Sequence, residues 1–96
     1  MRIVILPSAR DDLADGFQFY ENQQEDLGSY FLESLFSDID SLHLYAGIHR
    51  VVFGSHRLLS KRFPYAIYYT KESEVAFVKA VLDCRRNPTF HRQRLR

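Results

Sequence analysis

Cysteine is almost absent from the sequence: the single Cys84 excludes a disulfide within the chain. Its position after a long apolar stretch favours a small buried side chain. A reactive thiol is the alternative, although no second cysteine or clear base accompanies it. Three histidines, His43, His49 and His56, show no metal-ligand spacing with one another or with the cysteine. We therefore expect no metal site and no cofactor.

Long apolar runs are also missing. No segment approaches the roughly 20 residues that a membrane-spanning helix needs, so we expect no membrane partner. The N-terminal MRIVILPS is too short for a signal peptide and is typical of a first strand, which favours a cytoplasmic location. What the chain does have is apolar side chains, at 46% of its 96 residues. That amount is enough for one core and one domain.

Charge of one sign is scarce in each half of the chain. Residues 1–48 carry two Arg and nine carboxylates, whereas residues 49–96 carry eleven Lys or Arg and three carboxylates. The formal net charge of +1 therefore hides an acidic half and a basic half. If the halves form different surfaces, the basic one suits an anionic partner. The alternative is that helices simply carry Asp and Glu while strand ends carry Arg.

The acidic half predicts two amphipathic helices that follow a short strand at residues 2–6. Ser8 is a suitable N-cap for the first helix, whose apolar positions recur every three or four residues within 9–20. Gly16 inside this stripe predicts a close contact with a neighbouring element, since Gly costs about 1 kcal/mol relative to Ala in a helix. The stripe resumes over residues 27–42. So short a connection predicts an antiparallel helical hairpin.

The basic half has the patterns of strands. We predict a loop over residues 45–54 with a short extended piece at 51–53. Three strands should follow, with the turn signals of Pro64 and of residues 71–73 between them. These strands are predicted at residues 57–61, 65–70 and 74–83.

Together these elements predict a single α+β domain over residues 1–96. An N-terminal strand and a two-helix antiparallel hairpin precede a three-stranded antiparallel meander, which forms a small curved sheet. The helices should cover one apolar face of the sheet and leave the other face basic. Residues 89–96, TFHRQRLR, show no periodicity and are predicted to form a flexible basic tail.

This order of elements, with several short segments, resembles the ParE/RelE superfamily of bacterial type II toxins. Arg57 with KRFPYAIYY at residues 61–69 carries part of the resemblance, and VLDCRRNP at residues 81–88 carries another part. Ala9-x-x-Asp12-Leu13 and Tyr20 in the first helix also look like the family. The resemblance covers nearly the whole chain and implies the RelE/ParE-like fold.

The resemblance implies a growth-arresting toxin that a cognate antitoxin neutralises. Family antitoxins typically wrap a disordered, often acidic segment around the toxin, which suits a basic sheet with exposed aromatic residues. The expected assemblies are a homodimer or a toxin–antitoxin hetero-oligomer. ParE-like members poison DNA gyrase, whereas RelE-like members cut messenger RNA on the ribosome. An inactive member that only binds antitoxin is a third alternative.

RNA cleavage needs an activated 2′-hydroxyl, charge stabilisation at the phosphate and a proton for the leaving oxygen. His91 is the sensible acid or base, because imidazole exchanges protons near neutral pH. Its alternative is a solvated tail residue. If the chain is RelE-like, the catalytic candidates are Lys61, Arg62, Arg85 and His91.

A broader set of cations could bind phosphate or a protein target, since guanidinium groups bind such anions with two parallel hydrogen bonds. Arg85 and Arg86 have a plainer alternative, in which they reach water or pair with Asp83 or a helix carboxylate. The binding candidates are Arg57, Lys61, Arg62, Arg85 and Arg86.

Tyr65, Tyr68 and Tyr69 are the candidates for antitoxin contact. They could instead stack on RNA bases or belong to the core. FPYAIYY and VLDCRRNP resemble the ParE branch more than the nuclease branch, which implies a gyrase-binding toxin without catalytic residues. In that case residues 85–96 are expected to face gyrase or another partner. Whether the chain is an enzyme depends on which branch applies.

Overall fold

The computed structural model describes residues 1–96, in which nine regular elements are present. No helix among them is long and apolar enough to cross a membrane. The elements, in chain order, are β1 (Arg2–Ile5), α1 (Pro7–Glu21), α2 (Leu27–Asp40), α3 (Leu42–Tyr45), β2 (Val51–Val52), β3 (Ser55–Leu59), β4 (Tyr65–Glu72), β5 (Val75–Asp83) and α4 (Pro88–Arg94).

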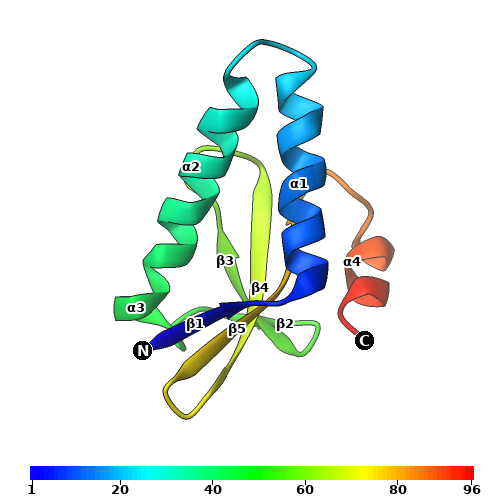
Figure 1. Cartoon of the computed structure of the whole chain (residues 1–96). Helices are drawn as coiled ribbons and strands as arrows, with labels where there is room; N and C mark the ends of the chain where they lie inside the picture. Colours follow the sequence, from blue (N-terminus) through cyan, green and yellow to red (C-terminus); the bar gives the residue numbers. More distant parts are fainter.

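The two long helices form the expected antiparallel hairpin and stand side by side against one face of the sheet (Figure 1). Gly16 lies at the contact between them, because a Cβ built on it would come within 2.5 Å of the Phe31 ring. The close contact predicted for Gly16 is therefore confirmed. The predicted Ser8 cap is wrong: α1 begins at Pro7, and the Ser8 hydroxyl donates to the Lys79 carbonyl at 2.8 Å. Proline suits the first helical position, since the N–H there has no helical partner.

The sheet has the strand order β1-β5-β4-β3-β2. The strands from β2 to β5 form an antiparallel meander, as expected, with the predicted short extended piece supplying β2. β1 joins β5 in parallel, with Arg2 opposite Val75. A bulge between Tyr68 and Tyr69 interrupts the pairing of β4 with β5. The α+β class and the predicted order of strand, helical hairpin and meander are therefore confirmed.

Each face of the sheet has its own apolar cluster. Under α1 and α2, the larger cluster includes Phe31, Leu35 and Ile67. On the opposite face, Leu82 belongs to a smaller cluster that includes Leu95 from the end of the chain. The sequence predicted a basic face there, and the structure adds an apolar cluster that α4 covers in part.

The C-terminal segment corrects a second expectation. Residues 89–96 were predicted as a flexible tail, but Pro88–Arg94 form a helix that starts at a side-chain cap. Asn87 Oδ1 accepts a hydrogen bond from the Thr89 N–H at 2.7 Å, and Pro88 occupies the first turn. Leu95 after the helix is buried. A seven-residue helix is marginal by itself, so its packing on the sheet must hold it in place.

Candidate functional site

His91 is the buried side chain that anchors α4 to the sheet. Its Nε2 lies 2.8 Å from the Asp83 carbonyl oxygen, and its Nδ1 lies 2.8 Å from the Tyr68 hydroxyl. A carbonyl can only accept, so Nε2 carries the proton and Nδ1 accepts from the tyrosine. Burial raises the pKa of Tyr68, while the nearby Arg57 guanidinium lowers it. His91 is therefore a buried bridge with both ring nitrogens hydrogen-bonded, and not the solvated residue of a tail.

A small cavity of about 170 Å³ opens beside this bridge. Arg57 from β3 and Arg86 from the segment after β5 both line it, together with the Tyr68 and His91 side chains. Cys84 also lines the cavity and is exposed, so its interpretation as a small buried side chain is wrong. The cavity gathers two guanidinium groups on one side of the sheet, which suits an anionic group of a partner.

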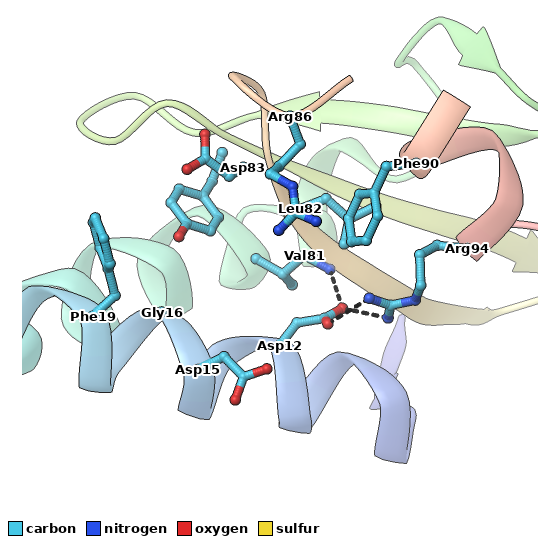
Figure 2. A pocket seen from close by; sticks show the side chains of 11 residues that line it. Asp12, Asp15, Gly16, Phe19, Val81, Leu82, Asp83, Arg86, Phe90 and Arg94 are labelled. Atoms are coloured by element: carbon cyan, nitrogen blue, oxygen red, sulfur yellow. Dashed lines mark hydrogen bonds and ion pairs between the residues drawn. The ribbon is translucent and has the colours of Figure 1, made fainter. Parts of the chain in front are cut away.

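A second cavity, of about 360 Å³, separates α4 from α1 (Figure 2). Asp12 of α1 lines this cavity, and its carboxylate accepts from the Val81 N–H at 3.0 Å. Both terminal nitrogens of Arg94 also donate to Asp12, each at 2.8 Å. The hydrogen bond with Asp12 raises the pKa of the Arg94 guanidinium. This buried carboxylate joins α1, β5 and α4 in one network.

Arg86 stands at the boundary of the two cavities, since it lines both. Its guanidinium carbon lies 3.9 Å from the centre of the Phe90 ring, a cation–π arrangement visible in Figure 2. It forms no ion pair within the chain. The stacking fixes the direction of a charge that remains available to a partner.

The neighbouring Arg85 is used differently. Its Nε and Nη2 donate to the two carboxylate oxygens of Asp83 at 2.9 and 2.7 Å. The hydrogen bond from Arg85 is the main reason that the pKa of Asp83 is lowered. This is the plainer of the alternatives for Arg85, which pairs with Asp83 and also reaches the Tyr20 hydroxyl at 3.5 Å. Arg85 and Arg86 are adjacent in sequence, but the Arg85 guanidinium is held in an ion pair and the Arg86 guanidinium is not.

The other predicted cations do not line these cavities. Lys61 and Arg62 lie exposed in the connection between β3 and β4. The structure thus brings Arg57, Arg86 and His91 together. Of the predicted nuclease set only His91 lines a cavity, because Lys61, Arg62 and Arg85 line neither one. No three His, Cys, Asp or Glu side chains lie together as a metal ion would need.

The three tyrosines proposed for antitoxin contact are core residues. Tyr65, Tyr68 and Tyr69 keep 7%, 1% and 0% of their surface exposed, which favours the core among the alternatives considered for them. Burial raises the pKa of Tyr65 to about 12. Large exposed apolar side chains occur elsewhere, at Phe19 and Phe36 among others.

Sequence reasoning missed the roles of two residues in the network. Asp12 was noted for its place in the first helix, but its partners come from 69 and 82 residues away. Arg94 was assigned to the tail. The signal that could have found α4 is Asn87-Pro88, a cap followed by proline at the first helical position.

The fold and the site together define a small α+β chain with a helical hairpin on one face of its sheet and a short C-terminal helix on the other. The chain is similar in fold to one in a solved structure described as the chromosomal ParDE TA system from P. aeruginosa. The TM-score is 0.75, at 14% sequence identity, and the match covers 84% of this chain and 92% of that one. No family model and no curated protein matches the sequence. The predicted resemblance is therefore confirmed in its fold.

Proposed function

We propose that this chain is the toxin of a type II toxin–antitoxin module, of the ParE-like kind. The observation that supports the proposal is the likeness of fold, over most of both chains, to the ParDE toxin–antitoxin structure. In this proposal the toxin acts in the cytoplasm, arrests growth by binding and poisoning DNA gyrase, and is held inactive by a cognate antitoxin. The toxin itself performs no chemical step.

The target-binding surface in this proposal surrounds α4 and the end of β5. Arg86 offers an unpaired guanidinium that stacking on Phe90 holds in place. Arg57 adds a second positive charge at the same small cavity. The Arg85–Asp83 ion pair lies beside the larger cavity, and because its two charges offset each other it adds more to the shape of the surface than to its net charge. Lys61 and Arg62 would extend the basic surface further.

Ribosome-dependent cleavage of messenger RNA is the second candidate function. One observation favours it, because Arg57, Arg86, Tyr68 and His91 line the same cavity. The hydrogen bonds of His91 argue against it: Nε2–H is held by a main-chain carbonyl and Nδ1 by Tyr68. Proton transfer by His91 would require breaking one of these bonds. We therefore place the binding mechanism first.

The deciding experiment titrates the purified chain into a plasmid-supercoiling reaction with DNA gyrase. Inhibition with accumulating linear plasmid is expected. No effect on gyrase, with cleavage of messenger RNA on added ribosomes, would instead establish the nuclease. Absence of both activities, with growth unaffected by expression, would leave an inactive member that only binds antitoxin.

The surface itself is tested by charge reversal. We expect Arg85→Glu/Arg86→Glu to lower growth arrest by at least about tenfold, because a well-placed charge at an interface contributes 1.4 kcal/mol or more. The matched control is Arg50→Glu/Lys71→Glu, which makes the same change of charge at exposed residues that line neither cavity. Growth arrest that survives the first double substitution would rule out this surface.

A further inference from the structure

Residues 46–50 connect α3 to β2 and are held against the sheet by side chains of β3 and β4. The hydroxyl oxygen of Tyr69 on β4 lies 2.9 Å from the Gly47 nitrogen and 2.5 Å from His49 Nδ1. On β3, His56 Nδ1 lies 2.6 Å from the His49 carbonyl oxygen. The His56 ring also stacks on the Tyr69 ring, with the two centroids 5.0 Å apart. His49 is therefore bound through both its ring and its main chain.

The partners of these hydrogen bonds fix the proton positions on both rings. The Gly47 N–H can only donate, so the Tyr69 oxygen accepts from it and the hydroxyl hydrogen is left for His49 Nδ1. His49 Nδ1 therefore carries no proton. A carbonyl can only accept, so His56 Nδ1 does carry one. His56 can thus gain a second proton at Nε2 and keep its hydrogen bond, whereas a proton on His49 Nδ1 removes the acceptor of Tyr69.

A proton on His49 would leave the Tyr69 hydroxyl hydrogen without a partner. Tyr69 has 0% of its surface exposed, so water cannot replace His49 while the connection stays closed. The neutral form of His49 therefore suits the closed connection, and the charged form suits one that opens to water. The pKa of His49 agrees with this geometry, because burial lowers it and the neighbouring His56 lowers it further.

No carboxylate compensates a positive charge at this position. The titratable and charged groups around His49 are Tyr69 of β4, His56 of β3, Arg50 in the connection itself and Lys71 of β4. Lys71 packs against Gly47, since a Cβ built there would lie 3.3 Å from the lysine Cδ. Neither His49 nor His56 forms an ion pair. A charged His49 in the closed connection would therefore meet only repulsion.

The connection continues into the hairpin of β2 and β3, which supplies part of the smaller cavity. The Arg57 N–H of β3 donates to the Arg50 carbonyl at 2.9 Å, so the connection and β3 are also joined through the main chain. Phe53 at the hairpin turn and Arg57 both line the cavity of about 170 Å³. Opening of the connection would therefore loosen the strand that carries one of the two guanidinium groups.

We propose that protonation of His49 opens residues 46–50, so that this connection is a pH-sensitive switch next to the cavity lined by Arg57 and Arg86. In the open form His49 has its ordinary pKa of 6.5, above that of the closed form, so the open form binds more protons. Opening is therefore favoured as the pH falls below 6.5, by up to about tenfold per pH unit, until the pH reaches the pKa of the closed form. The opening does not depend on the target, and only its effect on target binding rests on the proposed function.

Hydrogen exchange of the Gly47 amide, expressed relative to an unstructured peptide at the same pH, measures the opening. We expect the protection of this amide to fall by about threefold or more between pH 7.5 and pH 5.5. Low concentrations of urea separate local opening from global unfolding. Urea should speed the exchange of the Leu6 amide, which bonds to the Val78 carbonyl, and should scarcely affect that of Gly47, because a local opening exposes little surface.

Two substitutions identify the residue that is protonated. His49→Gln keeps an acceptor for Tyr69 but cannot be protonated, so the protection of Gly47 should no longer depend on pH. The matched control is His43→Gln, at an exposed histidine that contacts the Met1 carbonyl, and it should keep the pH dependence. Protection that does not change with pH in the wild type, that changes equally in His49→Gln, or that responds to urea as Leu6 does would each overturn the proposal.

The effect on the target is measured by gyrase inhibition, as the ratio of the wild type to His49→Gln at each pH. The two chains should inhibit equally at pH 7.5, and the wild type should inhibit about threefold less well at pH 6. An equal ratio at both pH values would overturn the link between the connection and the cavity. Absence of inhibition by both chains would contradict the proposed function, whereas the exchange of Gly47 would still decide the opening.

Discussion

Asp12 illustrates how one side chain can fix the packing of three elements. Its carboxylate is buried to 9% exposure and accepts from the Val81 N–H and from Arg94. Removing it leaves a main-chain donor without its partner and a partly buried guanidinium without its counter-charge.

We expect Asp12→Ala to lower the free energy of unfolding by about 2–3 kcal/mol. Asp15→Ala is the control: this exposed carboxylate on the same helix has no hydrogen bond or ion pair in the chain, and its removal should cost within about 0.5 kcal/mol. Urea denaturation of the two variants measures the difference. Equal stability of both would mean that the network is not important to the fold.

His49 is a second residue whose environment has a measurable consequence. The buried Tyr69 hydroxyl accepts from the Gly47 N–H at 2.9 Å and donates to His49 Nδ1 at 2.5 Å. Burial lowers the pKa of His49, and the neighbouring His56 lowers it further. Protonating His49 would remove the acceptor that Tyr69 uses.

Because the folded pKa of His49 lies below its unfolded value of 6.5, the unfolded chain binds more protons between the two values. This contribution to stability is present above 6.5 and decreases as the pH falls toward the folded pKa, by at most about 1.4 kcal/mol per pH unit. Urea denaturation of the wild type between pH 7 and about pH 5 should show this decrease. His49→Gln, which cannot be protonated, should flatten it, and an unaltered pH dependence would contradict the assignment.

At the scale of elements, the periodicity of apolar residues predicted the helices and strands that short stretches of sequence determine. The helical stripes, the hairpin and the meander follow periods of three to four residues and of two along the sequence. Gly16 was identified because glycine is costly in a helix unless space demands it. These features need no knowledge of distant parts of the chain.

The parts that failed depend on distant contacts. TFHRQRLR has no helical stripe because its apolar residues, Phe90 and Leu95, pack on the sheet from a single short helix. Tyr65 and Tyr69 of β4 belong to the cluster under α1 and α2, whereas Tyr68 belongs to the cluster that α4 covers, so their burial depends on elements from both ends of the sequence. The candidate site formed by Arg57 and Arg86 was partly predicted as a list of cations. Their grouping apart from Lys61 required the fold.

The α1–α2 contact gives a prediction for an element. Gly16→Ala should lower the free energy of unfolding by about 1–3 kcal/mol, because the added methyl would meet the fully buried Phe31 ring at 2.5 Å and force repacking. Helix propensity alone would predict a gain of about 1 kcal/mol. Ser29→Ala at an exposed position of α2 is the control. A rise in the thermal midpoint of Gly16→Ala would show that the helices can separate freely.

At the scale of the molecule, charge is segregated by half. The chain has a net charge of +1 and a pI near 7.9, yet the acidic residues gather on the helical hairpin and the basic ones on the strands and α4. Two oppositely charged surfaces can each bind a partner although the whole is nearly neutral.

We therefore expect the protein near pH 8 and low ionic strength to be retained by both cation- and anion-exchange resins, and released from both as salt screens surface charge over about 10 Å at 0.1 M. Arg85→Glu/Arg86→Glu should weaken retention on the cation exchanger and strengthen it on the anion exchanger. Passage of the wild type through both resins would show that its charges are interspersed.

The pairing of β1 with β5 has a consequence for how the molecule is made. Arg2 pairs with Val75, and Asp12 binds Arg94, so segments far apart in the sequence must meet before the sheet closes and α4 is held in place. Such high contact order makes folding slow. During translation, the first strand and the helical hairpin leave the ribosome well before their partners are synthesised. The arginine-lined surface is therefore assembled only after β5 and α4 have been synthesised, and a growing chain that lacks them cannot present it.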